Sequence, residues 1–196
     1  MENGLIHTKE IIILATIDVI DEYGIHGLST REVAKRVGIS EPGIFRHFKS
    51  KSTLLLAVLD HFSLYDEDVI HSIKVKYQDP MEAIYKFVET YALYYENYPA
   101  ITAMMQNMDL LRKDPNLSDK VKTILLNRTL FLTELIKQAQ KLGKIDLEID
   151  SKGLAITIIG IEREWCLNWR LADFSFSLSE KILGTLEMTL KAFQKD

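Results

Sequence analysis

The amino-acid sequence predicts an all-α protein of about nine helices. Apolar residues recur at helical spacing through almost the whole chain, and side chains suited to capping a helix stand before most of these segments. Only 9 Gly and 4 Pro occur among 196 residues, which favours long regular elements over many short strands. We find no convincing strand alternation, internal repeat or low-complexity stretch in the sequence.

The first four predicted helices lie before the middle of the chain. The first ends at Tyr23-Gly24, because glycine commonly terminates a helix. The second begins after Ser29, which has a capping-box partner three residues later, and ends at Gly38. Ser40 caps a short third helix with a proline in its first turn, and Ser50 caps a long fourth helix.

Five further helices are predicted in the remainder. Asp79 and Asp114 each precede a proline, which pairs a capping carboxylate with a residue suited to the first helical position. Asp150 and Ser177 are further capping residues. The predicted helices lie near residues 80–97, 100–112, 115–142, 151–171 and 177–193.

Composition excludes several classes of protein. Hydrophobic residues make up 47% and charged residues 27%, the balance of a globular rather than a disordered protein. The single cysteine, Cys166, forms no internal disulfide, which favours a reducing, cytoplasmic location. We expect no signal peptide, because acidic residues flank and interrupt the first apolar run, and no apolar stretch reaches the ~20 residues that span a bilayer.

Positive charge gathers in one segment of this weakly acidic chain, whose formal net charge is -4. Phosphate contacts depend on local clustering, so overall acidity does not exclude a nucleic-acid partner. A solvated basic face is the alternative. The segment holds Arg31, Lys35, Arg36, Arg46, Lys49 and Lys51 against Glu32 and Glu41.

The second and third predicted helices have the arrangement of a helix-turn-helix, with Gly38 in the tight turn. On a helical wheel Ile44 and Phe48 face inward, while Pro42 and Arg46 lie on the opposite side. A short helix with an outward arginine fits the major groove, which is about 12 Å wide.

Cations at helix starts give a second indication of a phosphate partner. Lys49 and Lys51 flank the start of the fourth helix, and Arg31 lies in the first turn of the second, where the helix dipole disfavours positive charge. An external phosphate would explain the placement, because helix-start N–H groups and these cations would all face it. Simple solvation is the alternative, since an exposed lysine there costs only about 0.3–1 kcal/mol.

Two motifs stand within residues 12–62, TREVA at residues 30–34 and GISEPGIFRHFKSK at residues 38–51. Through these motifs, residues 12–62 strongly resemble the DNA-binding domain of the tetracycline-repressor (TetR) family. The rest of the chain is similar more loosely, through helix number and the connection at residues 143–150. The resemblance implies a helix-turn-helix domain over residues 1–50 and a helical effector-binding and dimerisation domain over residues 51–196.

The resemblance also implies which residues meet double-stranded DNA. Backbone contacts fall to the start of the second helix, base or phosphate contacts to the outer face of the third, and a phosphate clamp to its end. Phe45 departs from the family's usual tyrosine, so a hydroxyl contact to phosphate is lost. Glu41 either accepts from a cytosine amino group or only complements the helix dipole. The implied residues are Thr30, Arg31, Glu41, Pro42, Gly43, Phe45, Arg46, His47, Lys49 and Lys51.

A ligand pocket is expected between the DNA-binding and dimerisation segments, where Met and Tyr are concentrated. Methionine adapts its shape and tyrosine is amphipathic, as suits a largely apolar small molecule, although packing in the core is the alternative explanation for each residue. The expected pocket residues are Phe62, Tyr91, Tyr95, Met104, Met105, Met108, Glu162 and Trp165. Two apolar stripes near the carboxyl end, Ile158 to Trp169 and Ile182 to Phe193, are expected to pair in part with a second copy.

These features favour a homodimeric, ligand-responsive transcriptional regulator, a repressor on a palindromic operator. The alternative is a DNA-associated structural protein controlled by a protein partner. An enzyme is disfavoured, because the sequence has no zinc-protease motif, phosphate-binding glycine loop or serine nucleophile motif. No cofactor or metal is expected; His47 has no second ligand at helical spacing.

Overall fold

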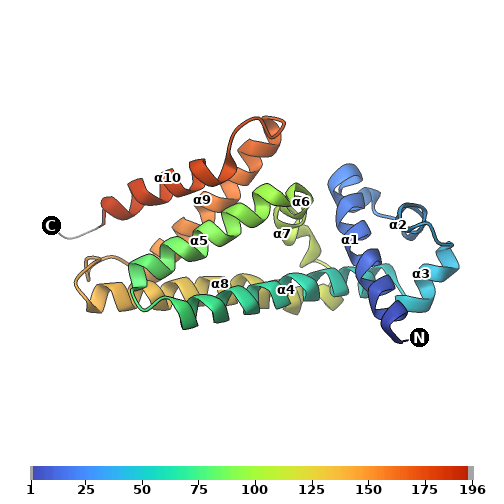
Figure 1. Ribbon diagram of the computed structural model, residues 1–196, viewed down its shortest axis with the longest axis horizontal. Coiled ribbons are helices and arrows are strands. Elements are labelled where there is room, and N and C mark those ends of the chain that lie inside the picture. The colour runs from blue at the N-terminus through green and yellow to red at the C-terminus, as the bar shows by residue number, and fades with distance from the viewer. Residues whose placement is uncertain (1, 194–196) are drawn as a thin grey trace. The chain divides into compact units, whose positions relative to one another are not determined.

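The computed structural model describes residues 2–193, with side chains from Thr8 onward, and all its regular elements are helices (Figure 1). This confirms the predicted all-α fold. The described helices are α1 (Glu2–Gly27), α2 (Thr30–Val37), α3 (Glu41–His47), α4 (Lys51–Lys76), α5 (Pro80–Asn97), α6 (Pro99–Gln106), α7 (Met108–Leu111), α8 (Pro115–Lys141), α9 (Ser151–Leu171) and α10 (Leu178–Lys191).

Most predicted boundaries are present as capping hydrogen bonds. Ser29 and Ser40 accept from the backbone N–H groups of Glu32 and Gly43 at 3.2 and 3.3 Å. Asp79 caps α5 and Asp150 caps α9 in the same way. Each cap satisfies backbone donors that have no partner within the helix.

Two boundaries differ from the prediction. The segment near 100–112 is two helices, because the backbone leaves the helical path at Asn107. Gly24 breaks α1 as expected, with φ 71° and ψ 171°, but a further turn follows to Gly27 before the chain enters α2.

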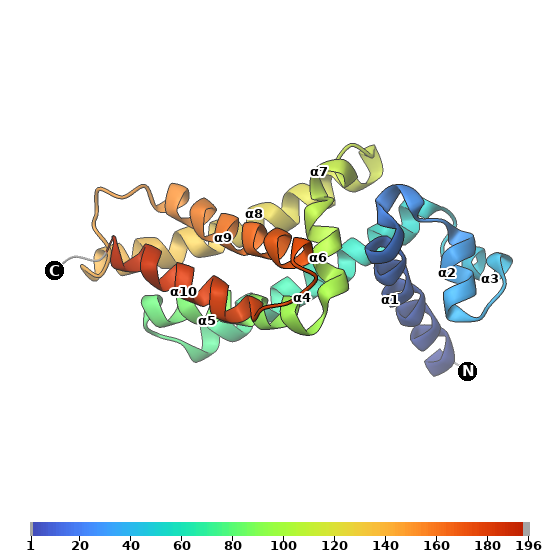
Figure 2. The ribbon, with the colours of Figure 1, turned by 90° about the horizontal axis from the view of Figure 1, so that it is seen from above.

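The described chain forms two compact units. Unit 1 comprises residues up to Leu64 together with residues 99–123. Within it α2 packs on α1 and on α3, and α6 packs along α1 (Figure 2). The core of unit 1 is built from buried apolar residues of these helices, among them Ile12, Ile20, Val33, Ile44, Leu54 and Met104.

Unit 2 comprises residues 65–98 and the chain from Ile124 on. Here α10 packs against both α5 and α9, and α4 and α8 are joined by a buried ion pair described below. Its core includes Phe87, Tyr91, Leu132, Ile158 and Leu186. Within the described part of the chain, no helix is both long and apolar enough to cross a membrane.

Candidate functional site

The turn between α2 and α3 is fixed by local hydrogen bonds. Gly38 adopts the left-handed conformation, with φ 77°, which glycine tolerates without steric cost. The backbone N–H of Ile39 donates to the Ala34 carbonyl at 3.0 Å, which closes the end of α2. The next residue, Ser40, caps α3, so the two helices meet at a defined turn, as a helix-turn-helix requires.

Helix α3 presents one face to the core and one to solvent. Ile44 and Phe48 are buried, which agrees with the helical wheel. Pro42, Phe45 and Arg46 are exposed, and 46% of the Phe45 surface is accessible. An exposed aromatic ring beside an exposed guanidinium is available to sugars, bases and phosphates.

Four of the predicted DNA-binding residues, Thr30, Glu41, Gly43 and His47, are buried or half-buried. Gly43 is buried, and a Cβ added there would lie 3.5 Å from Ile39 Cδ1 and Ser40 Oγ, an ordinary contact. The Thr30 hydroxyl donates to Glu41 Oε1 at 2.5 Å, which ties the starts of α2 and α3 together. Glu41 therefore has an intramolecular role, whichever way its second oxygen faces. His47 is half-buried.

The basic residues of this segment fall into two groups. Arg36 forms an ion pair with Glu22 of α1, and Lys51 Nζ lies 3.4 Å from the Ile25 carbonyl oxygen. All five residues are exposed, but the side chains of Arg31, Arg46 and Lys49 form no hydrogen bond or ion pair with the described residues. An exposed cation with no internal partner can bind an external anion without first breaking a contact.

A buried ion pair lies inside unit 2. The Arg128 guanidinium of α8 donates through Nε and Nη2 to the two oxygens of Asp66 on α4, at 2.8 and 2.7 Å. Arg128 Nη1 donates to the Tyr95 hydroxyl at 2.7 Å, and the Tyr91 hydroxyl donates to Asp66 Oδ1 at 2.8 Å. The guanidinium carbon also lies 4.1 Å from the centre of the Tyr91 ring, a cation–π contact.

Glu162 of α9 is a second buried carboxyl group in the same interior. Only 2% of its surface is accessible, and its Oε1 has no hydrogen-bond partner. Burial raises the pKa of Glu162 to about 8, because a low-dielectric interior disfavours the charged form, although the nearby Arg128 opposes this shift. Burial also raises the pKa of the Cys166 thiol, one helical turn further along α9.

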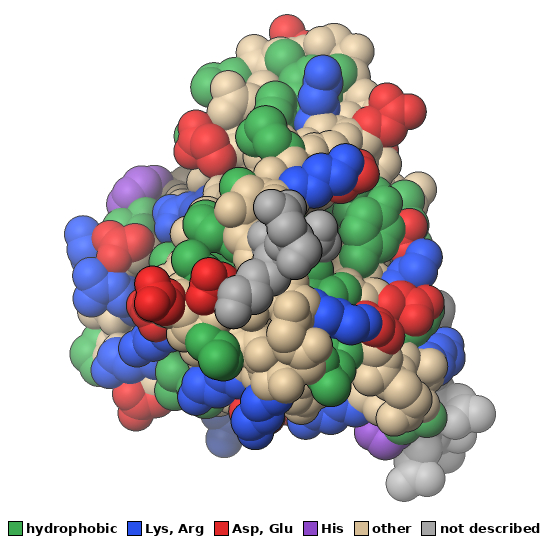
Figure 3. All heavy atoms as spheres, turned by 90° about the vertical axis from the view of Figure 1, so that its left-hand side faces the viewer, with side chains coloured by type: hydrophobic (Ala, Val, Ile, Leu, Met, Phe, Trp, Pro, Cys, Tyr) green, Lys and Arg blue, Asp and Glu red, His purple; other side chains and the backbone are tan. Residues whose placement is uncertain are grey.

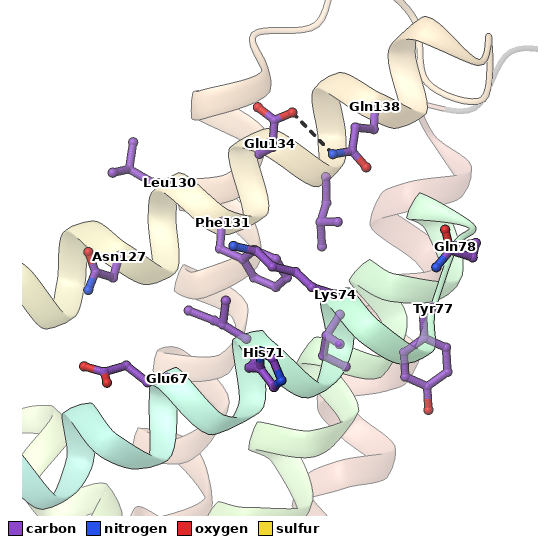
Figure 4. Close-up of a pocket in the computed structure, with 13 residues that line it drawn as sticks. Glu67, His71, Lys74, Tyr77, Gln78, Asn127, Leu130, Phe131, Glu134 and Gln138 are labelled. Atoms are coloured by element: carbon purple, nitrogen blue, oxygen red, sulfur yellow. Dashed lines mark hydrogen bonds between the residues drawn. The ribbon is translucent and has the colours of Figure 1, made fainter.

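A cavity of about 620 Å³ lies between α4 and α8 in unit 2. Figure 4 shows the labelled side chains of Glu67, His71 and Lys74 from α4 beside Phe131 and Glu134 from α8. Lys74 Nζ lies 5.5 Å from the centre of the Phe131 ring. The volume of this cavity is within the range of about 300–1,000 Å³ that is usual for small-molecule sites.

The cavity residues are not among those predicted from the sequence. Of the predicted pocket residues, Tyr91, Tyr95 and Glu162 share the interior of unit 2. Trp165 is half-buried there, and its Nε1 donates to Thr185 Oγ1 at 2.8 Å. The remaining predicted residues, Phe62, Met104, Met105 and Met108, belong to unit 1, where all but Met105 are buried.

The carboxy-terminal stripes serve partly as internal core. Ile158, Trp169, Ile182 and Leu186 are buried within unit 2. A different set of apolar side chains remains exposed on α9 and α10: Ile156, Leu167, Leu171 and Met188. The face drawn in Figure 3, which looks onto the carboxy-terminal end of α10, instead carries interspersed acidic and basic side chains.

Comparison with known proteins matches the amino-terminal segment to one family. Residues 12–58 match the family model described as bacterial regulatory proteins, tetR family. The class A tetracycline repressor from transposon 1721 of Escherichia coli is 36% identical over 62 residues, which cover 32% of this chain and 28% of that protein.

Two further proteins are similar over most of the chain. The nucleoid occlusion factor SlmA of Vibrio atlanticus is 23% identical over 158 residues, 80% of this chain and 80% of that protein. The crystal structure of the transcriptional regulator FadR from Bacillus subtilis, in complex with stearoyl-CoA, superposes with a TM-score of 0.76 at 21% identity. That superposition covers 90% of this chain and 96% of FadR, and shows that the two share a fold.

Proposed function

This chain belongs to the TetR family of bacterial regulatory proteins through its amino-terminal domain, and we propose that it is a homodimeric, ligand-responsive transcriptional repressor. Residues 1–50 bind a palindromic operator, residues 51–196 bind the effector and pair the two copies, and the protein acts on DNA in the cytoplasm. It needs no catalytic group, cofactor or metal for this role.

The outer face of α3 carries the proposal. Pro42, Phe45 and Arg46 are exposed together on a helix whose opposite side is anchored in the core by Ile44 and Phe48. A rigidly seated helix with an unpaired guanidinium can enter the major groove and donate two hydrogen bonds to a guanine edge. The exposed cations Arg31 and Lys49 then hold the backbone, with the other predicted contacts, Thr30, Glu41, Gly43, His47 and Lys51, around them.

A palindromic operator has two identical half-sites, so the proposed protein binds it as a two-fold symmetric dimer. A symmetric dimer presents two copies of α3 to half-sites one or more helical turns apart. The exposed apolar residues Ile156, Leu171 and Met188 on α9 and α10 supply a surface for a second copy. Gly160, with open space around its Cα, lies on the same helix and allows close approach of a partner helix.

The effector is proposed to be a largely apolar small molecule bound in unit 2. Support comes from the cavity between α4 and α8 and from the tyrosine-rich interior behind it. The related fold of FadR, which was crystallised with stearoyl-CoA, is compatible with an apolar ligand. Helix α4 contributes residues to both units, so a ligand that displaces its second half changes the separation of the two α3 helices.

The test compares Arg46→Ala with Arg36→Ala, which removes the same charge from the same domain. Arg46→Ala is expected to weaken specific DNA binding by about 1–3 kcal/mol per half-site in fluorescence anisotropy. Arg36 is paired with Glu22, away from the outer face of α3, so its replacement leaves specificity unchanged. Equal effects of the two substitutions would place the recognition surface elsewhere.

A second candidate is a DNA-associated protein controlled by a protein partner. The similarity to SlmA, a nucleoid occlusion factor, over 80% of both chains favours it. The helix-turn-helix has the same role in both candidates. They are separated by whether a small molecule or a cellular protein changes the affinity of the purified protein for its DNA.

A further inference from the structure

The interior of unit 2 contains two buried acids and one buried base. Among its described residues, Asp66 and Glu162 are the buried carboxyl groups, and the Arg128 side chain, with 12% of its surface accessible, faces Asp66. Two hydrogen bonds join Arg128 to Asp66 in a bidentate pair. The positive charge of Arg128 is balanced by the negative charge of Asp66, so Glu162 has no cation of its own.

The unpaired state of Glu162 has a measurable cost. A buried polar atom without a hydrogen-bond partner has lost its hydration without gaining a replacement contact. Such groups are uncommon in native interiors, so each one points to a strained or a functional position. The groups that act on the Glu162 carboxyl are Arg128 of α8 and Asp66 of α4, and the carboxyl in turn acts on Tyr95 of α5 and Cys166 of its own helix.

An acidic ligand does not fit this interior. Four hydrogen bonds hold the ion pair: the three from Arg128 end on Asp66 and Tyr95, and the fourth runs from the Tyr91 hydroxyl to Asp66. A carboxylate would have to displace Asp66 to reach Arg128, because Glu162 has no positive charge with which to pair it. A buried anion without a cation is strongly unfavourable in a low-dielectric interior.

The aromatic rings around the ion pair favour a cation in this interior. Tyr91 already holds the Arg128 guanidinium against its ring face at 4.1 Å. Tyr65 and Tyr94 stack at 3.9 Å beside it, so the interior is rich in aromatic faces. Tyrosine faces attract ammonium groups, and the attraction grows when the cation is desolvated.

A line of aromatic rings connects the open cavity with this interior. Phe131 lines the cavity between α4 and α8, and its ring centre lies 5.2 Å from that of Phe87. Phe87 in turn lies 4.9 Å from Tyr91. The line continues from Tyr91 to Tyr95, whose ring centre lies 6.0 Å away.

We propose that the effector of this protein is an amphipathic cation, an amine or ammonium group on an apolar chain, whose charge pairs with Glu162 beside the completed Asp66–Arg128 pair. The inference rests on the proposed function, because it names the chemical class of that effector. Glu162 is protonated when alone and ionises when the cation arrives, so binding releases a proton.

The experiment uses three probes that have the same ten-carbon alkyl group but different head groups: decylammonium, decanol and decanoate. Each is used below its micelle-forming concentration. Isothermal titration calorimetry in two buffers of different ionisation enthalpy measures the protons released. Decylammonium is expected to bind most tightly and to release close to one proton at pH 7. With the Glu162 pKa about 8, its affinity rises about tenfold from pH 7 to pH 9, over which an alkylamine, with a pKa near that of lysine at about 10.4, stays charged.

Matched variants separate the carboxyl group from general effects. Glu162→Gln keeps the side-chain shape, and is expected to abolish proton release and weaken decylammonium binding at pH 9 at least tenfold. Glu164→Gln, on the exposed side of the same helix, changes neither quantity. Equal binding of decanoate, pH-independent binding of decylammonium, or unchanged binding by Glu162→Gln would each overturn the inference. The wild-type proton count needs no variant, so misfolding cannot obscure it.

Failure of this inference is distinguishable from failure of the proposed function. Calorimetry is performed without DNA, and operator binding is measured separately by anisotropy. Specific DNA binding without decylammonium uptake rejects the cationic effector and leaves the regulator intact. Decylammonium uptake with no sequence-specific DNA binding rejects the proposed function instead.

Discussion

Removing the buried base of unit 2 is expected to destabilise the protein more than removing its partner acid. Arg128→Met leaves the Asp66 carboxylate with the Tyr91 hydroxyl as its remaining donor. Breaking a buried pair in this way costs about 3–5 kcal/mol, because an uncompensated charge stays in the interior. Asp66→Asn leaves Arg128 near a second carboxyl group, Glu162, which can ionise and replace the lost charge. Its cost is therefore smaller, about 1–3 kcal/mol.

Urea denaturation at pH 7 and fixed protein concentration measures both costs, with tryptophan fluorescence as the signal. Lys120→Met is the control, since its partner Asp60 is half exposed and a surface pair contributes at most about 1 kcal/mol. Glu162→Gln in the Asp66→Asn background removes the replacement charge. The free energy of unfolding that it costs there should exceed the cost of Glu162→Gln in the wild-type protein. If Asp66→Asn is as damaging as Arg128→Met, or if Glu162→Gln adds nothing to it, the charge balance assigned to this interior is wrong.

Three further predictions follow from other parts of the molecule. Lys49→Ala, which removes an exposed phosphate contact, should reduce the slope of log affinity against log salt by about 0.9 per protomer while leaving sequence preference unchanged, as measured by anisotropy at several salt concentrations. Because the pKa of Glu162 is raised, the native state keeps a proton that the unfolded state has released, so the free energy of unfolding falls as the pH rises from about 4.5 to about 8 and then levels. Glu162→Gln should flatten this part of the pH profile in urea melts. A variant profile parallel to that of the wild type would contradict the assignment. Met188 on α10 is 67% exposed, and Met188→Glu would place a carboxylate in the proposed apolar interface. The dimer dissociation constant should rise at least tenfold in analytical ultracentrifugation without loss of helicity, and an unchanged constant would place the interface elsewhere.

Local signals made much of this fold predictable. Caps such as Ser29 and Ser40 act within three residues of their own position, and the turn at Gly38 depends on one backbone conformation, so the sequence contains all that is needed to place them. The break at Asn107 was missed because neither glycine nor proline marks it, and no side-chain hydrogen bond caps the helix that follows.

The interior of unit 2 was less predictable because its contacts are distant in sequence. Asp66 and Arg128 are separated by 62 positions, and neither stands in a motif. Glu162 has two charged neighbours, Arg163 and Glu164, and only helical packing determines that Glu162 faces inward while they face solvent. The cavity between α4 and α8 likewise depends on how two long helices lie, and the Met- and Tyr-rich composition did not indicate it.

Selection of DNA sequences from a random pool by the purified protein tests the central assignment most directly. The exposed outer face of α3, presented twice by a symmetric dimer, predicts enrichment of one palindromic sequence with two identical half-sites. Recovery of unrelated sequences, bound no more tightly than the starting pool, would contradict the assignment of this chain as a sequence-specific regulator.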